Sequence, residues 1–249
     1  MVKAIMLCGG KGERLDPLTR DMPKAIIPFQ GRPLLEQSVY SYWKYGIWEL
    51  WLSVGHKASE VTDKYVYPSL FEPYPIGTGG WLSMLKKDKD LMEHFKQDDF
   101  YVNNADNLLN VDLKEMMEFH KRNKNIVTIA CVMVDDVRDG GSINIKDNKI
   151  TKFKEKIQSP KPKKGYINAG FYIFSPEIFN YVPDLVFEDV PGQGTIAKST
   201  SLEKDIFPRI VKTNKVGGFI VNFKDGNRQW FDTGTFERYK EASNKWLGV

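Results

Sequence analysis

The strongest constraint on this chain is a glycine-rich segment that directly follows a short apolar strand. Gly9, Gly10 and Gly12 come after the apolar stretch that ends at Leu7. Glycine lacks a Cβ, so a loop of this composition allows positive φ and lets backbone N–H groups approach an anion closely. Beyond the glycines, Arg14 has a guanidinium that can bind two phosphate oxygens at once. The segment therefore predicts a loop that holds a polyphosphate at the end of the strand.

Lys24, which follows Pro23, adds a second cation shortly after this loop. Its ammonium group is a compact point charge that suits a phosphate. Two commoner phosphate-binding motifs do not fit. No Gly-Lys-Ser/Thr follows at the Walker interval, and Leu15 occupies the third-glycine position of the dinucleotide fingerprint. A turn that only joins strand to helix would explain the glycines but neither Arg14 nor Lys24.

The stretch from Leu7 to Thr19, followed by Pro23-Lys24, resembles the signature G-G-x-G-x-R-L-x-P-L-T and P-K of the sugar-1-phosphate nucleotidyltransferases. Enzymes of this family condense a nucleoside triphosphate with a sugar 1-phosphate to give an NDP-sugar and pyrophosphate. The resemblance implies that Arg14 and Lys24 are catalytic. It also implies nucleotide contacts from the loop residues Leu7, Gly9, Gly10 and Gly12.

The composition is that of an ordinary globular domain. The chain has 249 residues, of which 41% are hydrophobic and 27% charged, enough to bury a large core. Its net charge of +4 comes from 36 basic and 32 acidic residues, an excess too small to indicate a nucleic-acid partner. Cys8 and Cys131 lie in apolar runs, so we expect buried thiols, no disulfide or zinc site, and a cytoplasmic setting. The apolar run before the glycine loop is too short for a signal peptide or a membrane span, so we expect no membrane partner.

Apolar strands alternate with helical patterns through the first half of the chain. This order predicts an α/β fold with a mixed, mostly parallel sheet and helices on both faces. The expected strands are residues 3–8, 49–54, 100–102 and 126–134, and the expected helices are residues 33–45, 59–67, 78–87 and 113–122. After about residue 139 we expect shorter strands at 141–145, 150–154 and 166–174, and a late helix at 236–246.

The family resemblance implies a Rossmann-like, glycosyltransferase-A-like sheet with a small sugar-binding lobe. We therefore expect a single domain over residues 1–249. Its nucleotide-binding half covers about 1–138, and its sugar-binding half with the C-terminal helix covers about 139–249. Ligands in such folds bind at the carboxyl ends of the strands. We expect no left-handed β-helical extension of the kind that some relatives carry.

Asp106 comes just after the predicted strand 100–102, where a sheet delivers side chains into its ligand crevice. Its surroundings resemble the N-G-D element of the family, which implies a catalytic aspartate that binds Mg²⁺. A carboxylate beside triphosphate oxygens is the hard oxygen ligand that this cation prefers. The chain departs from the family pattern at Ala105, which replaces the usual glycine, and at Asn107. An exposed turn aspartate is the alternative.

Asp232 lies in the stretch Trp230-Phe231-Asp232-Thr233-Gly234-Thr235, which resembles the family element W-x-D-x-G-T. The resemblance implies a second metal ligand, so that two aspartates from distant parts of the chain hold one Mg²⁺. A helix N-cap is the competing role for Asp232. Thr233 or Thr235 can supply that cap for the following helix and leave Asp232 free for the metal.

Two short elements in the second half resemble the sugar-binding motifs of the family. Glu155-Lys156 resembles an E-K pair in which the lysine binds the sugar phosphate and the glutamate a hydroxyl group. Asn168-Ala169-Gly170 resembles the N-A-G turn, and the Asn168 amide offers a donor and an acceptor to sugar hydroxyls. The resemblance thus implies substrate contacts from Glu155, Lys156, Asn168 and Gly170. A surface ion pair is the alternative for Glu155 and Lys156.

The stretch from Pro75 to Gly80 resembles P-L-G-T-A/G-G, the family element that lies against the base and ribose. The resemblance implies nucleotide contacts from Gly77, Thr78 and Gly79. Trp81 follows where a small residue is common, and it either packs under the sheet or narrows the pocket. The three histidines share no ligand spacing, so we expect structural or solvated roles for His56, His94 and His120.

The motifs look most like those of the mannose- and heptose-1-phosphate guanylyltransferases. This likeness slightly favours GTP as the nucleotide and a role in cell-surface polysaccharide biosynthesis. Uridylyl- and thymidylyltransferases share nearly every motif and stay open as alternatives. So do a cytidylyltransferase acting on a non-sugar phosphate and a non-catalytic subunit that binds a sugar nucleotide. Many members are homo-oligomers, and the sequence leaves the oligomeric state undecided.

Overall fold

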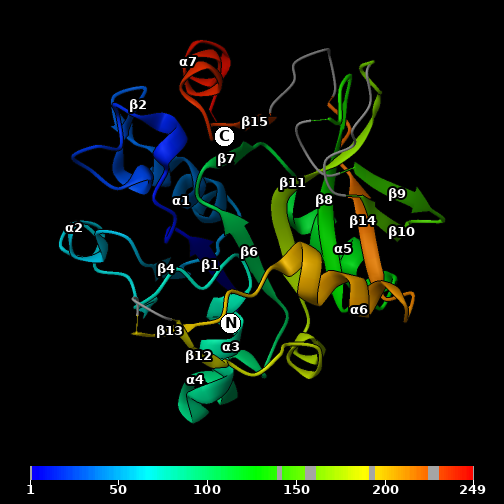
Figure 1. The fold of residues 1–249 in the computed structure, drawn as a ribbon. Helices are drawn as coiled ribbons and strands as arrows, with labels where there is room; N and C mark the ends of the chain where they lie inside the picture. The colour runs from blue at the N-terminus through cyan, green and yellow to red at the C-terminus, as the bar shows by residue number, and fades with distance from the viewer. Residues whose placement is uncertain (1, 139–141, 155–160, 191–193, 224–229, 249) are drawn as a thin grey trace.

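One mixed sheet organises the part of the chain that the structure describes. The computed structural model describes residues 2–138, 142–154, 161–190, 194–223 and 230–248. Within them, nine strands form a sheet in the order β5-β4-β1-β6-β11-β8-β14-β10-β9 (Figure 1). In chain order these are β1 (Lys3–Leu7), β4 (Glu49–Val54), β5 (Ser69–Phe71), β6 (Phe100–Asn104), β8 (Val127–Val134), β9 (Ser142–Lys146), β10 (Lys149–Lys154), β11 (Gly165–Phe174) and β14 (Val216–Ile220).

Helices cover both faces of this sheet. One face carries α1 (Leu34–Lys44), α2 (Ala58–Thr62) and α5 (Leu113–Arg122), and the other carries α3 (Gly80–Lys87), α4 (Lys89–Phe95) and α6 (Phe207–Val211). Successive residues of a strand point to opposite faces. Met6 of β1 therefore joins the first buried cluster, whereas its neighbour Ile5 joins the second. The strand that precedes the glycine loop is thus buried on both sides.

The predicted α/β architecture is confirmed, but the sheet is less parallel than we expected. β1 pairs in parallel with β4 and β6, and β4 with β5. In the second half, β11 runs antiparallel to β6 and β8, and β10 runs antiparallel to β9 and β14. The strands that we assigned to a small lobe, β9 to β11, therefore extend the main sheet. A pattern of alternating apolar residues identifies a strand but does not show in which direction it enters the sheet.

Several elements carry too weak a sequence pattern to be predicted. β5 is only three residues long, and β14 contains Gly217 and Gly218, which are unfavourable in strands. Gly217 is needed because a Cβ there would lie 2.0 Å from Asn125 Nδ2. The helix expected at 59–67 ends at Thr62, after which the rings of Tyr65 and Tyr67 stack on each other.

The last helix, α7 (Phe236–Lys245), packs against the N-terminal part of the chain, beside the short strand β2 (Pro28–Phe29), which pairs with β3 (Arg32–Pro33) (Figure 1). Its contact residues form a third buried cluster that includes Leu15, Phe231 and Trp246. The strand before it, β15 (Trp230–Asp232), pairs antiparallel with β7 (Asn107–Leu109). This pairing brings the segment of Asp232 next to the segment of Asp106.

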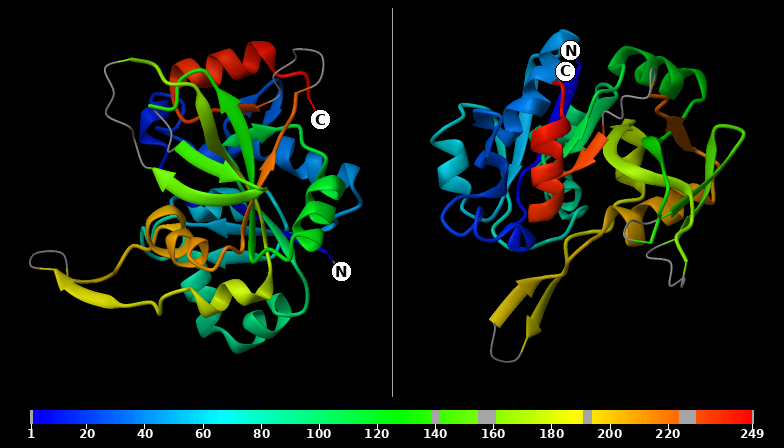
Figure 2. Two further views of the ribbon diagram at one scale, coloured as in Figure 1. Left: turned by 90° about the vertical axis from the view of Figure 1, so that its right-hand side faces the viewer. Right: turned by 90° about the horizontal axis from the view of Figure 1, so that it is seen from above.

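A hairpin of β12 (Phe187–Val190) and β13 (Gly194–Ala197) extends away from the sheet (Figure 2). Its base contacts the body through Phe187, whose ring meets that of Tyr74 edge to face at 6.3 Å. In the described part of the chain, none of the helices has the length and apolar character that a bilayer crossing requires.

Candidate active site

The carboxyl ends of the parallel strands β1, β4, β5 and β6 border a cavity of about 750 Å³. This is the edge at which open α/β sheets bind ligands. The cavity wall consists of residues 7–11, 24–25, 55–56, 71–78, 81 and 104–106. The glycine loop and the stretch around Thr78, which are far apart in the sequence, therefore face the same space.

The cavity contains about half of the residues that we predict for the site. Its wall includes Leu7, Gly9, Gly10, Lys24, Gly77, Thr78 and Asp106. The residues that lie outside the wall are Gly12, Arg14, Gly79, Asn168, Gly170 and Asp232. Glu155 and Lys156 lie outside the described residues.

Gly12 shapes the glycine loop from behind the cavity. Its φ of 68° lies in the left-handed region, and its carbonyl accepts a hydrogen bond from Thr19 Oγ1 at 2.8 Å. A Cβ on Gly12 would lie 3.0 Å from Thr19 Cγ2 and 3.2 Å from Lys24 Cβ. Gly12 is therefore required where the loop passes Lys24.

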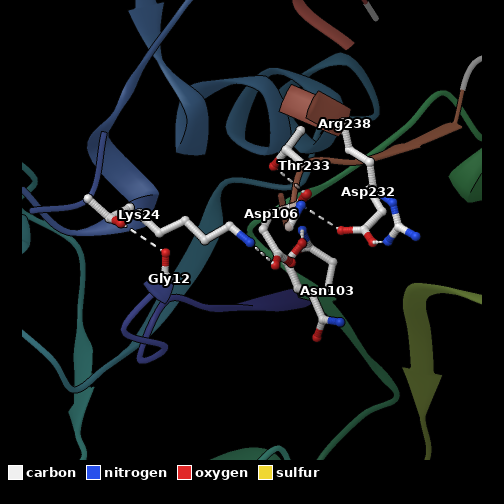
Figure 3. A network of polar contacts seen from close by, with 10 residues as sticks. Gly12, Lys24, Asn103, Asp106, Asp232, Thr233 and Arg238 are labelled. Atoms are coloured by element: carbon white, nitrogen blue, oxygen red, sulfur yellow. Dashed lines mark hydrogen bonds and ion pairs between the residues drawn. The ribbon is translucent and has the colours of Figure 1, made fainter. Parts of the chain in front are cut away.

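Lys24 and Asp106 form an ion pair at the edge of the cavity (Figure 3). Their side chains are 11% and 30% exposed, so solvent ions screen this pair only weakly. The backbone carbonyl of Asp106 accepts hydrogen bonds from Thr233 N at 3.0 Å and Thr233 Oγ1 at 2.8 Å. Because Thr233 is fully buried, these bonds hold the turn that carries Asp106. Two of the residues that we predict to be catalytic thus stand together.

Asp232 is held by two donors in the same region (Figure 3). Its Oδ1 accepts from Gly234 N at 2.7 Å, and its Oδ2 accepts from Arg238 Nη1 at 2.6 Å. A Cβ on Gly234 would lie 2.7 Å from Asp232 Oδ1 and 3.3 Å from Arg14 Nη2, so Arg14 also lies close by. Thr235 caps α7 by accepting from Arg238 N, as we expected, but Asp232 is paired with Arg238 rather than free.

The Gly77-Thr78-Gly79 element makes protein contacts on the side away from the cavity. Gly77 has a φ of 80°, and a Cβ on it would lie 2.4 Å from Ser199 Oγ. Thr78 Oγ1 donates to Glu203 Oε2 at 2.9 Å, and Gly79 N donates to the Thr200 carbonyl at 2.8 Å. These glycines therefore let the cavity wall lie against the segment 199–203.

For Trp81 the sequence left two roles open, packing under the sheet or narrowing the pocket, and the structure shows which contacts it makes. Its side chain is buried and its ring stacks on Phe174 at 6.4 Å between centroids. Its Nε1 donates to the Thr78 carbonyl at 3.0 Å. Trp81 thus packs in the core while it also forms part of the cavity wall.

The predicted sugar-binding turn contacts the loop that carries Asp106. Gly170 has a φ of 76°, and a Cβ there would lie 1.9 Å from Asn107 Nδ2 and 3.0 Å from Asn104 Nδ2. Asn168 Oδ1 accepts from Gly170 N at 2.9 Å, and Asn168 Nδ2 donates to the Tyr172 hydroxyl at 2.8 Å. Asn107 is buried beneath this turn, which accounts for its presence after Asp106.

The family model described as nucleotidyl transferase matches residues 3–248 of this chain. The chain belongs to the nucleotidyl transferase family. A mannose-1-phosphate guanylyltransferase from Mycobacterium tuberculosis is 28% identical over 97% of the chain and 64% of its own length. A probable glucose-1-phosphate cytidylyltransferase from Bacillus subtilis is 26% identical over 76% of the chain and 82% of its own length.

Solved structures share the fold of this nucleotidyl transferase. The crystal structure of HddC from Yersinia pseudotuberculosis complexed with GMP-PN has a TM-score of 0.74 and 26% identity, over 98% of this chain and 99% of that one. The match to the M. tuberculosis relative covers 64% of its length, and the matches to two fungal mannose-1-phosphate guanyltransferases each cover 61%. The chain thus spans less than two thirds of the length of these three relatives.

The residues of the nucleotidyl transferase site fit the Mg²⁺ that the resemblance implies. Asp106 and Asp232 present carboxylates from segments joined by the pairing of Asp232 with Asn107. Among the described residues no group of three or more His, Cys, Asp or Glu side chains could hold a metal ion. Two carboxylates with substrate phosphate oxygens are a usual ligand set for Mg²⁺. The donor set therefore suits a cation that binds together with a nucleotide.

Glu72 and His56 are cavity residues that the sequence patterns did not reveal. Glu72 follows the short strand β5, and Ser53 Oγ donates a hydrogen bond to its carboxylate. Burial raises the pKa of Glu72 above its ordinary value, although the bond from Ser53 opposes this. His56, for which we expected a structural or solvated role, lines the cavity, and its backbone N–H donates to the Gly9 carbonyl at 3.2 Å. Recognising β5 as a parallel strand would have placed Glu72 at this edge.

Proposed function

We propose that this protein transfers a nucleotidyl group from a nucleoside triphosphate to a sugar 1-phosphate, giving an NDP-sugar and pyrophosphate. The observation that carries the proposal is the Lys24–Asp106 ion pair beside Gly9 and Gly10 in one cavity. It unites a cation for phosphates, a carboxylate suited to Mg²⁺ and a glycine loop whose backbone N–H groups can approach an anion. The names of the relatives, mannose-1-phosphate guanylyltransferase and glucose-1-phosphate cytidylyltransferase, support the same reaction class.

The reaction needs alignment and charge neutralisation more than acid–base chemistry. A phosphate oxygen of the sugar 1-phosphate, already an anion, forms a bond to the α-phosphorus. The bond between that phosphorus and the pyrophosphate oxygen breaks, and no proton has to move.

Each residue has one task in this proposal. Gly9, Gly10 and Arg14 hold the departing β- and γ-phosphates, and Lys24 neutralises charge at the α-phosphate. Asp106 and Asp232 would hold Mg²⁺, which supplies further positive charge beside the phosphate oxygens when it is bound. From the resemblance, Lys156 would bind the sugar phosphate, and Glu155, Asn168 and Gly170 would contact the sugar.

We favour GTP as the nucleotide because of Glu72. Its carboxylate faces the cavity next to the glycine loop, since a Cβ on Gly9 would lie 3.1 Å from Glu72 Oε2. A carboxylate accepts two hydrogen bonds side by side, which matches the N1–H and N2–H of guanine. Uracil and thymine offer a single ring N–H, and cytosine offers only its amino group. The complex of HddC with GMP-PN supports this choice.

The proposal places the enzyme in the cytoplasm, where nucleoside triphosphates are available, and in the biosynthesis of cell-surface polysaccharides. Cys8 and Cys131 are free and buried, which agrees with a reducing compartment.

The test is pyrophosphate release with Mg²⁺ across GTP, UTP, dTTP, CTP and ATP, each with a panel of hexose, heptose and amino-sugar 1-phosphates. Phosphocholine serves as a non-sugar acceptor. We expect release that requires GTP and one sugar 1-phosphate together. Release with CTP instead of GTP would contradict the choice of nucleotide and would match the cytidylyltransferase named for the B. subtilis relative. No release from folded protein, or release only with phosphocholine, would contradict the proposal.

A further inference from the structure

Both carboxylates that we assign to the metal already carry a cation from the chain itself. Asp106 pairs with Lys24, and Asp232 pairs with Arg238. At Asp232 both oxygens are engaged, Oδ1 by Gly234 N and Oδ2 by the Arg238 guanidinium. A divalent cation on Asp232 Oδ2 therefore has to replace Arg238 or share the oxygen with it.

The two cations differ in how easily they can leave. The Lys24 side chain is 11% exposed, so its ammonium has little water to replace Asp106 if the pair separates. The Arg238 side chain is 36% exposed and begins in the first turn of α7. A partly exposed arginine side chain keeps contact with water when it moves, and its length lets it reach several positions. Arg238 is thus the cation that can be exchanged.

The surroundings of Arg238 offer it a second anion. Arg14, which we assign to the departing phosphates, lies on the same side of Gly234 as Asp232 Oδ1, because a Cβ on this glycine would be 3.3 Å from Arg14 Nη2 and 2.7 Å from Asp232 Oδ1. Phosphates held by Arg14 would therefore lie within the neighbourhood of Arg238. A guanidinium binds phosphate as well as carboxylate oxygens.

We propose that Arg238 is an exchangeable counter-ion of Asp232, which it occupies in the free protein and leaves for the nucleotide phosphates when a divalent cation binds. The inference rests on the proposed function, because it uses the metal and phosphate positions given there. It makes Arg238 a further substrate-binding residue. It also makes metal and nucleotide binding cooperative, because the binding of either ligand favours the separation of Arg238 from Asp232, which the other ligand also requires.

The first experiment measures metal binding without any reaction. Mn²⁺ is titrated into nucleotide-free protein and free Mn²⁺ is followed by electron paramagnetic resonance, for wild type, Arg238→Ala and Arg238→Lys. We expect Arg238→Ala to bind Mn²⁺ about tenfold more tightly, the effect of losing one charge-assisted hydrogen bond that competes. Arg238→Lys should lie between the two. Lys245→Ala is the control, because Lys245 pairs with Glu241 on the same helix, and it should equal wild type.

The second experiment adds a non-hydrolysable GTP analogue to the same titration. We expect the analogue to increase Mn²⁺ affinity in wild type by a factor several times larger than in Arg238→Ala. An unchanged or weaker Mn²⁺ affinity of nucleotide-free Arg238→Ala would overturn the inference. So would an Asp232→Asn variant that binds Mn²⁺ like wild type. Neither result touches the transfer reaction, which the pyrophosphate assay on wild type tests separately.

Discussion

At the scale of single residues, the ion pair of Lys24 and Asp106 links stability to chemistry. The Lys24 ammonium is largely buried, so a variant that removes its partner without replacing the hydrogen bond leaves a poorly solvated cation. Asparagine keeps the size of the side chain and an oxygen that can accept from Lys24. Asp106→Asn therefore separates loss of charge from loss of fold.

We predict that Asp106→Asn lowers kcat by roughly 10²- to 10³-fold, as expected when one charge is lost at a site of phosphoryl transfer. Pyrophosphate release measures the rate, and circular dichroism during heating measures the fold. Asp184→Asn is the control, because Asp184 pairs with Lys86 on the exposed surface, and it should retain wild-type activity. Near-normal kcat in Asp106→Asn would remove this residue from the mechanism.

The raised pKa of Glu72 leads us to predict that nucleotide binding depends on pH. Burial raises its pKa, so the carboxylate becomes protonated at a higher pH than an ordinary glutamate and then no longer accepts two hydrogen bonds. We expect the KM for GTP to rise as the pH falls through this raised pKa. Glu72→Gln should weaken GTP binding at least about tenfold, the usual effect of one lost hydrogen bond to a charged group, and should abolish this acidic limb. An identical pH profile in the variant would exclude Glu72 from base recognition.

The same shift has a consequence for stability. The folded protein binds the Glu72 proton more tightly than the unfolded chain, so the contribution of this group is favourable below the ordinary pKa of 4.5 and is lost as the pH rises through the folded pKa. Glu72→Gln should therefore raise the free energy of unfolding of the nucleotide-free protein at pH 7 and leave it nearly unchanged at pH 4. Urea denaturation at the two pH values measures the difference.

At the scale of elements, the packing of the cavity wall on residues 199–203 depends on Gly77. Gly77→Ala introduces both an unfavourable φ and a Cβ that would lie 2.4 Å from Ser199 Oγ and 2.5 Å from the Thr200 carbonyl. Gly31→Ala is a matched control, since Gly31 has a φ of 81° but nothing within 4 Å of its Cβ. We expect about 1 kcal/mol of destabilisation at Gly31 from φ alone, and at least about twice that at Gly77. Equal losses of the free energy of unfolding for Gly77→Ala and Gly31→Ala, measured by urea denaturation, would show that residues 199 and 200 move to accommodate the new Cβ.

Trp246, the residue that follows α7, anchors the end of this helix to α1. Its ring is buried and its Nε1 donates to the buried Gln37 Oε1 at 3.0 Å. Trp246→Ala should cost about 3 kcal/mol in stability and should also lower activity, because α7 carries Arg238, which we propose to bind the nucleotide phosphates. Leu247→Ala is the control, because its side chain is 73% exposed, and it should change neither. Full activity of Trp246→Ala with reduced stability would show that the position of α7 does not affect the reaction.

At the scale of the whole molecule, the reactivity of the two cysteines can measure the unfolding of the two faces of the sheet. Cys8 belongs to the buried cluster on one face and Cys131 to that on the other. Burial raises the pKa of both thiols, so each should react far more slowly with a thiol reagent in the native state than in the unfolded chain. Because one sheet carries both clusters, we predict that both become reactive in a single transition as urea increases, measured by labelling and mass spectrometry. Labelling of one thiol well before the other would reveal separate unfolding of one face.

Much of the fold and part of the site follow from local patterns. The predicted strand 49–54 and helix 113–122 have the same bounds in the structure as β4 and α5, because each has a clear period and ends at a recognisable signal. The cap at Thr235 follows from the same local rules. Strand direction does not, and β5 and β14 are too short or too rich in glycine to be seen in the sequence.

The sequence alone determined the family likeness, the α/β class, the glycine-rich loop after the first strand and the approximate places of Lys24 and Asp106, because adjacent residues carry these signals. The tertiary structure decided what depends on contacts between distant segments. It joined Asp232 to Arg238, placed Glu72 in the cavity and set Gly170 against Asn107. It also brought the later strands into the main sheet. These contacts depend on how strands pair across the sheet, and no periodicity within a single segment records which partner it will meet.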